Sequence, residues 1–250
     1  MSKWRVIFCG VLLSMGLVSM AQASLSDSLT VEDLKENGVL FTPHNRVTLL
    51  PSGAEKFEDM FKAIEQARHY IYLEYFNFRN DSIGKALFTL LDKKVREGVK
   101  VRVIYDDFGN VSNDRPLRKR HLRQLKSRHF EVVVFDPIVF PWVNHALHRD
   151  HRKIVVIDDK VVYTGGMNVA DYYIHGRPEF GKWRDMHMRL EGDCVPLYRR
   201  IFCEMWERCT GDKIDSLEYQ TDSLAFQNDR IPGIERDGLR GFFRRSFGRG

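Results

Sequence analysis

Between residues 151 and 168 the chain gathers side-chain types that suit chemistry on a phosphodiester. They follow the spacing H-x-K-x4-D-x6-G-G-x-N, which assigns His151, Lys153, Asp158, Gly165, Gly166 and Asn168. An imidazole can attack phosphorus and form a covalent intermediate, which splits one difficult displacement into two easier steps. His151 is therefore the predicted nucleophile, and the predicted reaction proceeds through a phosphohistidine.

The other residues of the motif are predicted to support this displacement. Lys153 is a compact charge suited to the non-bridging oxygens, where the transition state carries negative charge. Gly165 and Gly166 let the backbone approach a ligand and offer N–H donors, and Asn168 can donate to a phosphate oxygen. Asp158 is counted with His151 and Lys153 among the predicted catalytic residues. It could orient the imidazole or hold the turn in which it lies, and the spacing alone does not separate these roles.

Two short runs rich in β-branched residues carry the motif. They occupy residues 154–157 and 161–164, and the Asp-Asp-Lys break between them predicts a hairpin. Because side chains two apart on a strand point the same way, we expect His151 and Lys153 on one face.

Hydrophobic periodicity extends this pattern along the chain. Further strands are predicted at residues 47–50, 70–78, 99–105, 132–135 and 186–190, and helices at 53–68, 83–96, 116–128 and 195–208. Alternating strands and helices indicate an α/β sandwich with a mixed central sheet flanked by helices.

The motif and its flanks resemble the phospholipase D superfamily, and in particular the first catalytic half of bacterial cardiolipin synthases. The resemblance covers about residues 47–211 and includes several short sequence segments besides the H-x-K-x4-D motif. These are Tyr72-Leu-Glu-Tyr-Phe-Asn-Phe-Arg, Asp81-Ser-Ile-Gly, Thr164-Gly-Gly-Met-Asn-Val-Ala-Asp-Tyr-Tyr, Trp183-Arg-Asp-Met-His and Leu190-Glu-Gly. The resemblance implies a phospholipase D-like α/β fold, a phosphatidyl-histidine intermediate at His151, and no metal or other cofactor.

Two acids in the resembling segments are candidates for supporting the site. Glu74 lies inside the apolar, aromatic run at 70–78, where a carboxylate either forms a structural ion pair or stands near the site. Asp185 lies in the Trp-Arg-Asp-Met-His phrase. The sequence shows no cluster of carboxylates suited to a metal ion, so we expect a metal-independent reaction.

The motif occurs once. Of the nine histidines, only His151 has a lysine two residues later. In the resembling family, the histidine of a second motif protonates the departing alcohol. Here that histidine must come from a second copy of the chain or from a partner that carries another such half, or it is missing because the chain is a truncated half.

Four functions are consistent with these residues. The leading interpretation is a phosphatidyltransferase that takes a phosphatidyl group from an anionic phospholipid and passes it to the hydroxyl of a second lipid. The alternatives are hydrolysis of phospholipid at the same site, a secreted homodimeric endonuclease of the same superfamily, and an inactive half that binds membrane. The single motif and the cationic segment 116–128 favour the nuclease and nucleic acid as its partner, whereas the phrases at 164–173 and 183–192 favour the lipid enzyme.

Charge and the chain ends indicate the cell envelope. The net charge of +5 suits a polyanionic partner such as a membrane surface, although many soluble proteins carry as much. Residues 1–23 combine a basic start, an apolar stretch and Ala-Gln-Ala, which predicts a signal peptide or an N-terminal membrane anchor. Residues 24–212 are expected to form the catalytic domain and residues 213–250 a basic tail or linker. We expect an exported or membrane-associated protein on the periplasmic side of a bacterial inner membrane.

Overall fold

The computed structural model of the chain describes residues 27–126, 130–139 and 147–215. The predicted signal or anchor and most of the predicted tail lie outside these residues. Within the described ranges, no helix combines the length and apolar character needed to cross a membrane.

The chain divides into two compact units. One consists of Met1–Thr42 with Leu224–Gly250, and its described part is helical over residues 27–36. The other, Pro43–Ser223, contains the sheet and every residue of the predicted site.

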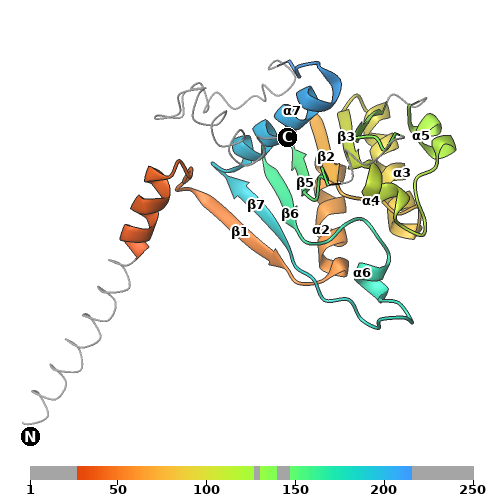
Figure 1. Ribbon diagram of the computed structural model, residues 1–250, viewed down its shortest axis with the longest axis horizontal. Helices are drawn as coiled ribbons and strands as arrows, with labels where there is room; N and C mark the ends of the chain where they lie inside the picture. Colours follow the sequence, from red (N-terminus) through yellow and green to blue (C-terminus); the bar gives the residue numbers. More distant parts are fainter. Residues whose placement is uncertain (1–26, 127–129, 140–146, 216–250) are drawn as a thin grey trace, which may run out of the picture. The chain divides into compact units, whose positions relative to one another are not determined.

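A seven-stranded mixed sheet forms the centre of the Pro43–Ser223 unit (Figure 1). Its strand order is β1-β7-β6-β5-β2-β3-β4. Strands β2, β3 and β4 run parallel to one another, and every other neighbouring pair is antiparallel. The bounds are β1 Asn45–Leu50, β2 Tyr70–Tyr75, β3 Lys100–Asp106, β4 Glu131–Phe135, β5 Lys153–Ile157, β6 Val161–Gly165 and β7 His187–Gly192.

Helices cover both faces of this sheet (Figure 1). Helices α2 (Gly53–Gln66) and α3 (Ser82–Arg96) pack on one face, and α7 (Val195–Thr210) packs on the other. The architecture confirms the predicted α/β sandwich with a mixed sheet. Three shorter helices are α4 (Asp107–Val111), α5 (Lys119–Lys126) and α6 (Tyr172–His175). The sequence did not predict α4 and α6, because so short a helix displays no helical repeat.

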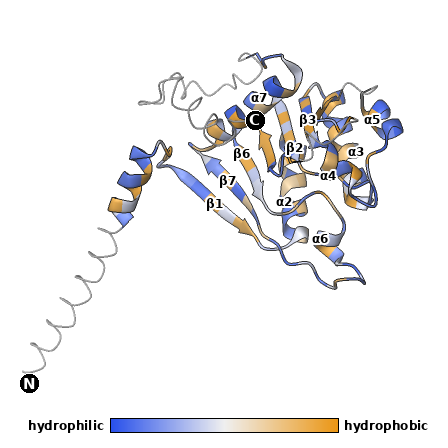
Figure 2. Ribbon diagram, viewed as in Figure 1, coloured by the Kyte–Doolittle hydropathy of each residue, from blue (hydrophilic) through white to orange (hydrophobic). Residues whose placement is uncertain are grey.

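Strand β5 is buried at every position and lies between β2 and β6. Val155 and Ile157 face the core under α2 and α3, whereas Ile154 and Val156 face the core under α7. Hydrophobic residues accordingly concentrate on the central strands, and β1 at the side of the sheet is more hydrophilic (Figure 2). A strand that is buried on both faces explains the uninterrupted Ile-Val-Val-Ile run.

The strand register brings several strand ends to one edge of the sheet. Tyr75 pairs with Lys153, and Gly165 pairs with His187. Asp106 ends β3 next to Tyr75, because β2 and β3 run parallel. We call this edge, defined by these five residues, the site edge.

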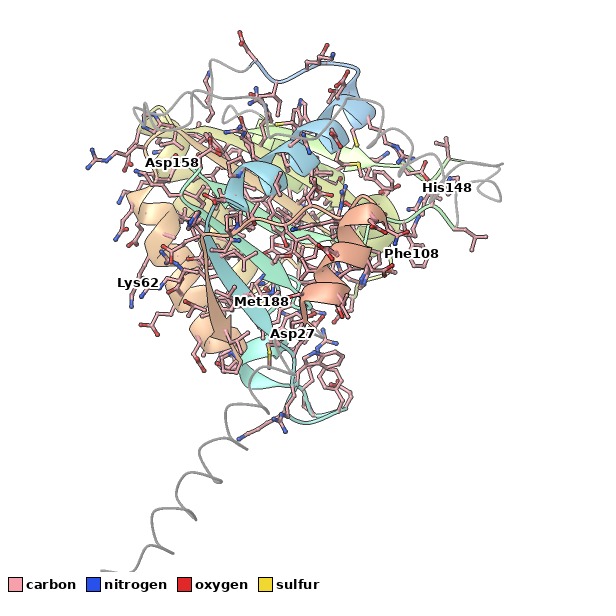
Figure 3. The ribbon with its side chains drawn as sticks, turned by 90° about the vertical axis from the view of Figure 1, so that its left-hand side faces the viewer. Asp27, Lys62, Phe108, His148, Asp158 and Met188 are labelled. Carbon is pink, nitrogen blue, oxygen red and sulfur yellow. The ribbon has the colours of Figure 1, made fainter. Side chains whose placement is uncertain are left out.

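Asp158 lies at the opposite edge, in the tight turn that joins β5 to β6. Asp158 and Asp159 have φ angles of 51° and 52°, and the N–H of Lys160 donates to the carbonyl oxygen of Ile157 at 2.9 Å. This turn confirms the predicted hairpin. Figure 3 shows the separation: Asp158 and His148, which precedes His151 by three residues, appear on opposite sides of the molecule.

The Asp158 carboxylate holds the segment between α2 and β2. It accepts hydrogen bonds from the backbone N–H groups of Arg68, His69 and Tyr70 at 2.7, 2.9 and 2.9 Å. The side chain is buried, so water cannot replace these bonds. The contacts therefore support the second of the two roles left open for Asp158, that of holding the turn.

We predict that Asp158→Asn destabilises the fold by about 2 kcal/mol, because an amide offers one acceptor oxygen where three buried N–H groups need partners. Chemical denaturation of the full chain measures this loss. Asp212→Asn, which changes an exposed carboxylate, should alter the free energy of unfolding by less than about 0.5 kcal/mol. Equal stability of the two variants would contradict the structural role of Asp158.

Candidate functional site

His151 and Lys153 come together at the site edge, where β5 begins. His151 is exposed, whereas the Lys153 side chain is buried. Both pack against the ring of Phe76, with 4.8 Å between the His151 and Phe76 ring centroids and 5.5 Å from Lys153 Nζ to the Phe76 centroid. Lys153 Nζ also donates to the carbonyl oxygen of His151 at 2.6 Å. An accessible imidazole thus lies beside a shielded cation, which suits attack on an anionic phosphorus centre.

Burial and charge lower the pKa of both groups. Desolvation lowers the pKa of His151, and the Lys153 charge lowers it further against the opposing effect of Asp150 and Asp106. Burial lowers the pKa of Lys153 to about 8, although Asp150 and Asp185 act in the opposite direction. A lowered pKa keeps the imidazole neutral near neutral pH, with a lone pair free for attack.

Charged pairs fasten the segment that leads into β5. Asp106 accepts hydrogen bonds from the backbone N–H of Asp150 at 2.8 Å and from Arg149 at 3.2 Å. Arg149 also pairs with Asp136, just beyond β4, at 2.8 Å. The residues before His151 are thereby tied to the ends of two neighbouring strands.

Glu74 lies on β2, on the face of the sheet that α7 covers. It is fully buried, and its Oε1 lies 2.6 Å from the guanidinium of Arg152, which also pairs with Asp150 at 3.3 Å. Burial raises the pKa of Glu74, the Asp150 charge raises it further, and Arg152 partly offsets both effects. These are the contacts of a structural ion pair, one of the two alternatives for Glu74, and they steady the residue that follows His151.

Gly165 and Gly166 make room for the segment that enters β7. Gly165 has a φ of 149°, and a Cβ there would lie 2.6 Å from the carbonyl oxygen of Met186. A Cβ at Gly166 would collide with the Asp185 carboxylate. The Gly166 N–H donates to the carbonyl oxygen of Met186 at 2.9 Å, so the prediction of a free backbone donor is wrong at Gly166.

Asn168 is buried in the loop that follows these glycines. Its Oδ1 accepts from the backbone N–H of Asn77, and its Nδ2 donates to the Tyr173 hydroxyl, both at 3.4 Å. Hydrogen bonds of this length are weak. Donation from Asn168 to a phosphate oxygen therefore stays a prediction that these contacts allow.

Asp185, the second predicted supporting acid, acts on the site edge through its charge. It is half-buried over Gly166. Burial lowers the pKa values of Lys56 and Lys153, and the Asp185 charge opposes this lowering. The two supporting acids thus differ, because Asp185 faces the amines of the site whereas Glu74 lies on the other face of the sheet.

His187 is a buried histidine at the first position of β7. It is fully buried, and neither ring nitrogen has a hydrogen-bond partner among the described residues. Burial lowers the pKa of His187 to about 2, together with the charges of Lys56 and Lys153. A ring that stays neutral at physiological pH cannot supply the proton for a leaving group, so His187 does not replace the missing second histidine.

Lys56, on α2, reaches the site edge, and the sequence interpretation missed it. The side chain is fully buried. Its signal in the sequence was a single charge within the apolar stripe of Phe57, Met60 and Ile64.

In residues 27–126, 130–139 and 147–215, no group of three or more His, Cys, Asp or Glu side chains is placed to hold a metal ion.

Residues 60–181 match a family model described as cardiolipin synthase, PLD-like domain. These residues include the second half of α2, all of β2 to β6 and the predicted motif. Residues 60–181 are thus similar to the phospholipase D-like domain of cardiolipin synthases. This finding confirms the superfamily that the motif indicated.

Individual relatives support the same placement. A probable cardiolipin synthase of Bacillus subtilis, YwiE, is 38% identical over 179 residues, which cover 71% of this chain and 35% of that protein. A cardiolipin synthase of Halalkalibacterium halodurans is 36% identical over 197 residues, covering 78% and 38%. The chain thus spans little more than a third of the length of these relatives. NucT from Helicobacter pylori superposes with a TM-score of 0.50 at 16% identity, covering 66% of this chain and 98% of that one, and shows the shared fold alone.

We predict that the His151 imidazole keeps reacting with diethyl pyrocarbonate below pH 6.5, the ordinary pKa of histidine, because burial and Lys153 lower its pKa. Mass spectrometry of the His151 peptide across about pH 5 to 8 gives the midpoint.

Lys153→Met removes the neighbouring positive charge and should raise this midpoint. Lys62→Met, which changes an exposed lysine of α2, is the matched control and should leave it in place. A midpoint at or above pH 6.5 in the unchanged protein would show that the site does not depress the pKa of His151.

Proposed function

We propose that the protein is a phosphatidyltransferase of the cardiolipin synthase type, which moves a phosphatidyl group between phospholipids through a phosphohistidine at His151. One observation carries the proposal: an exposed imidazole lies beside the shielded Lys153 amine, in a domain 36–38% identical to cardiolipin synthases. Asp158 has a structural role in this proposal.

In the first step, a ring nitrogen of neutral His151 attacks phosphorus, and the bond from phosphorus to the headgroup oxygen breaks. The Lys153 ammonium stabilises charge on the non-bridging oxygens, and an acid gives a proton to the departing alcohol. In the second step, the hydroxyl of another lipid attacks the phosphohistidine and gives its proton to the conjugate base of that acid, and the bond from phosphorus to nitrogen breaks to release neutral His151. Water in place of that hydroxyl gives hydrolysis, so the acceptor decides between transferase and hydrolase.

Protonation of the leaving alcohol requires a general acid, and the single motif of this domain does not contain a second histidine for that role. General acid catalysis is worth about 10²–10⁴-fold, and it needs a donor within hydrogen-bond reach of the leaving oxygen. We propose that a second motif-bearing half provides this histidine, in a homodimer or in a partner. A two-fold dimer would place two copies of His151 across one shared cleft.

Exposed apolar side chains near the site edge favour a lipid substrate over nucleic acid. Phe180, Trp183 and Met186 are 44%, 43% and 50% exposed in the segment that leads into β7, and Phe108 of α4 is 44% exposed. Aromatic side chains of this kind suit the boundary between water and lipid. Exposed cations at the start of α5 add attraction to anionic headgroups. They are Arg118, Lys119, Arg120 and Arg123.

The proposed location follows from the proposed substrate. An anionic phospholipid is available at a membrane surface, and residues 1–23 have the pattern of an export signal or membrane anchor. We therefore place the enzyme in a bacterial cell envelope, at the inner membrane with the domain on the periplasmic side, acting without a cofactor.

We predict that His151→Ala lowers phosphatidyl transfer by at least about 10³-fold and Lys153→Ala by about 10²-fold, because one removes the nucleophile and the other a transition-state charge. Purified protein is incubated with labelled phosphatidylglycerol vesicles in chelator, with plasmid DNA in parallel. His175→Ala, an exposed histidine of α6, should retain activity. Transfer that survives in His151→Ala, or cleavage of DNA without any lipid product, would refute the proposal.

We also predict that inactive copies depress activity beyond dilution if two copies complete the site. With equal amounts of wild-type and His151→Ala chains, only about a quarter of freely exchanged dimers are fully wild-type. Activity at increasing fractions of the variant should therefore fall below the wild-type fraction. A proven monomer with full activity would exclude a shared site.

A further inference from the structure

Lys56 brings a second amine to the site edge from a helix that the motif does not include. Its Nζ donates to the backbone carbonyl oxygens of Met167 and Asn168, each at 3.0 Å. These residues directly follow Gly165 and Gly166 in the chain. The amine therefore ties α2 to the loop that carries the predicted phosphate-binding amide.

Aromatic rings enclose the same amine. Lys56 Nζ lies 4.5 Å from the ring centroid of Phe57 and 5.0 Å from that of Tyr75. Tyr75 is the register partner of Lys153, so α2, β2 and β5 converge at this point. An ammonium over ring faces is favourable once water is excluded.

Lys56 and Lys153 act on the same neighbours. Both charges lower the pKa of His187. Burial lowers the pKa of both amines, and the Asp185 charge opposes this lowering in both. The Lys153 charge in turn lowers the pKa of Lys56. The two amines therefore lie in one shielded region at the site edge.

A packing role alone does not explain a lysine at this position. Position 56 lies within the buried stripe of α2, where a methionine or leucine would fill the same space. Burial of an amine is unfavourable unless its protons find acceptors, and here the acceptors are the two carbonyl oxygens of one loop. The lysine at this position thus has a specific consequence, which is to fix that loop.

We propose that Lys56 is a positioning residue of the phosphate site, which holds the Met167–Asn168 loop so that the Asn168 amide and the Lys153 amine address the same phosphate group. The proposal rests on the proposed function, because the ligand is the phosphate of a phosphodiester. Without the amine the two carbonyl oxygens lose their donor, and the loop loses its link to α2.

Lys94 of α3 offers a matched control. Like Lys56 it is a buried lysine, and its Nζ donates to the carbonyl oxygen of Glu65 at 3.0 Å and to Glu97 at 2.5 Å. These contacts join the last turns of α2 and α3, away from the site edge. Lys94→Met therefore removes a buried amine and its backbone bond without touching the site.

The test measures binding of inorganic phosphate to the full chain by calorimetry. Slower modification of His151 by diethyl pyrocarbonate in the presence of phosphate locates the bound anion. Lys56→Met should weaken phosphate binding by about tenfold or more, whereas Lys94→Met should bind like the wild type at a comparable loss of thermal midpoint. Lys56→Arg keeps a cationic donor and should recover part of the affinity.

The outcomes separate this inference from the proposed function. Phosphate binding by folded Lys56→Met that equals the wild type would overturn the inference alone. Equal weakening in Lys56→Met and Lys94→Met would assign the effect to stability and also overturn it. Failure of wild-type protein to protect His151 with phosphate would remove the proposed function as well. If Lys56→Met does not fold, Lys56→Gln, which keeps an N–H donor without the charge, replaces it in the comparison.

Discussion

β5 is a fully buried strand that pairs antiparallel with both β2 and β6. This pairing keeps β5 extended across the sheet, so the residues at its two ends lie at opposite edges. His151 and Lys153 are therefore at one edge and Asp158 at the other. At about 3.3 Å per residue, the seven steps from His151 to Asp158 span roughly 20 Å. The motif is continuous in sequence but divided in space. Its first residues, His151 and Lys153, form the proposed site, and its last residue, Asp158, holds the segment between α2 and β2.

The site edge concentrates positive charge where water is largely excluded. Lys153 and Lys56 are both buried there. Burial and the charges of these two lysines lower the pKa of His187, so its ring stays neutral. Charge held in place in this way stabilises a phosphoryl transition state better than charge that must first reorganise in water. The fold offsets the unfavourable burial with backbone carbonyl acceptors for both amines and with the nearby carboxylate of Asp185.

The sequence alone predicts the strands and the nucleophile, because both depend on local patterns. Runs of Val and Ile predict the strands, and the fixed spacing of His151 and Lys153 predicts the nucleophile. The role of Asp158 could not be predicted from the spacing, because its partners are the backbone N–H groups of residues 68–70, about ninety positions away in the chain. The contacts of Lys56 could not be predicted, because they join residues more than a hundred positions apart. The acceptor of the Gly166 N–H could not be predicted either, since that acceptor, the carbonyl oxygen of Met186, lies in the segment just before β7.

Direct capture of the covalent intermediate shows whether His151 is the nucleophile. The protein is incubated with phosphatidylglycerol vesicles, quenched, digested at neutral to alkaline pH and analysed by mass spectrometry. We expect a phosphatidyl group attached to the His151 side chain and to no other residue. A phosphatidyl adduct on a different side chain, or product that accumulates while His151 stays unmodified at every time point, would contradict it.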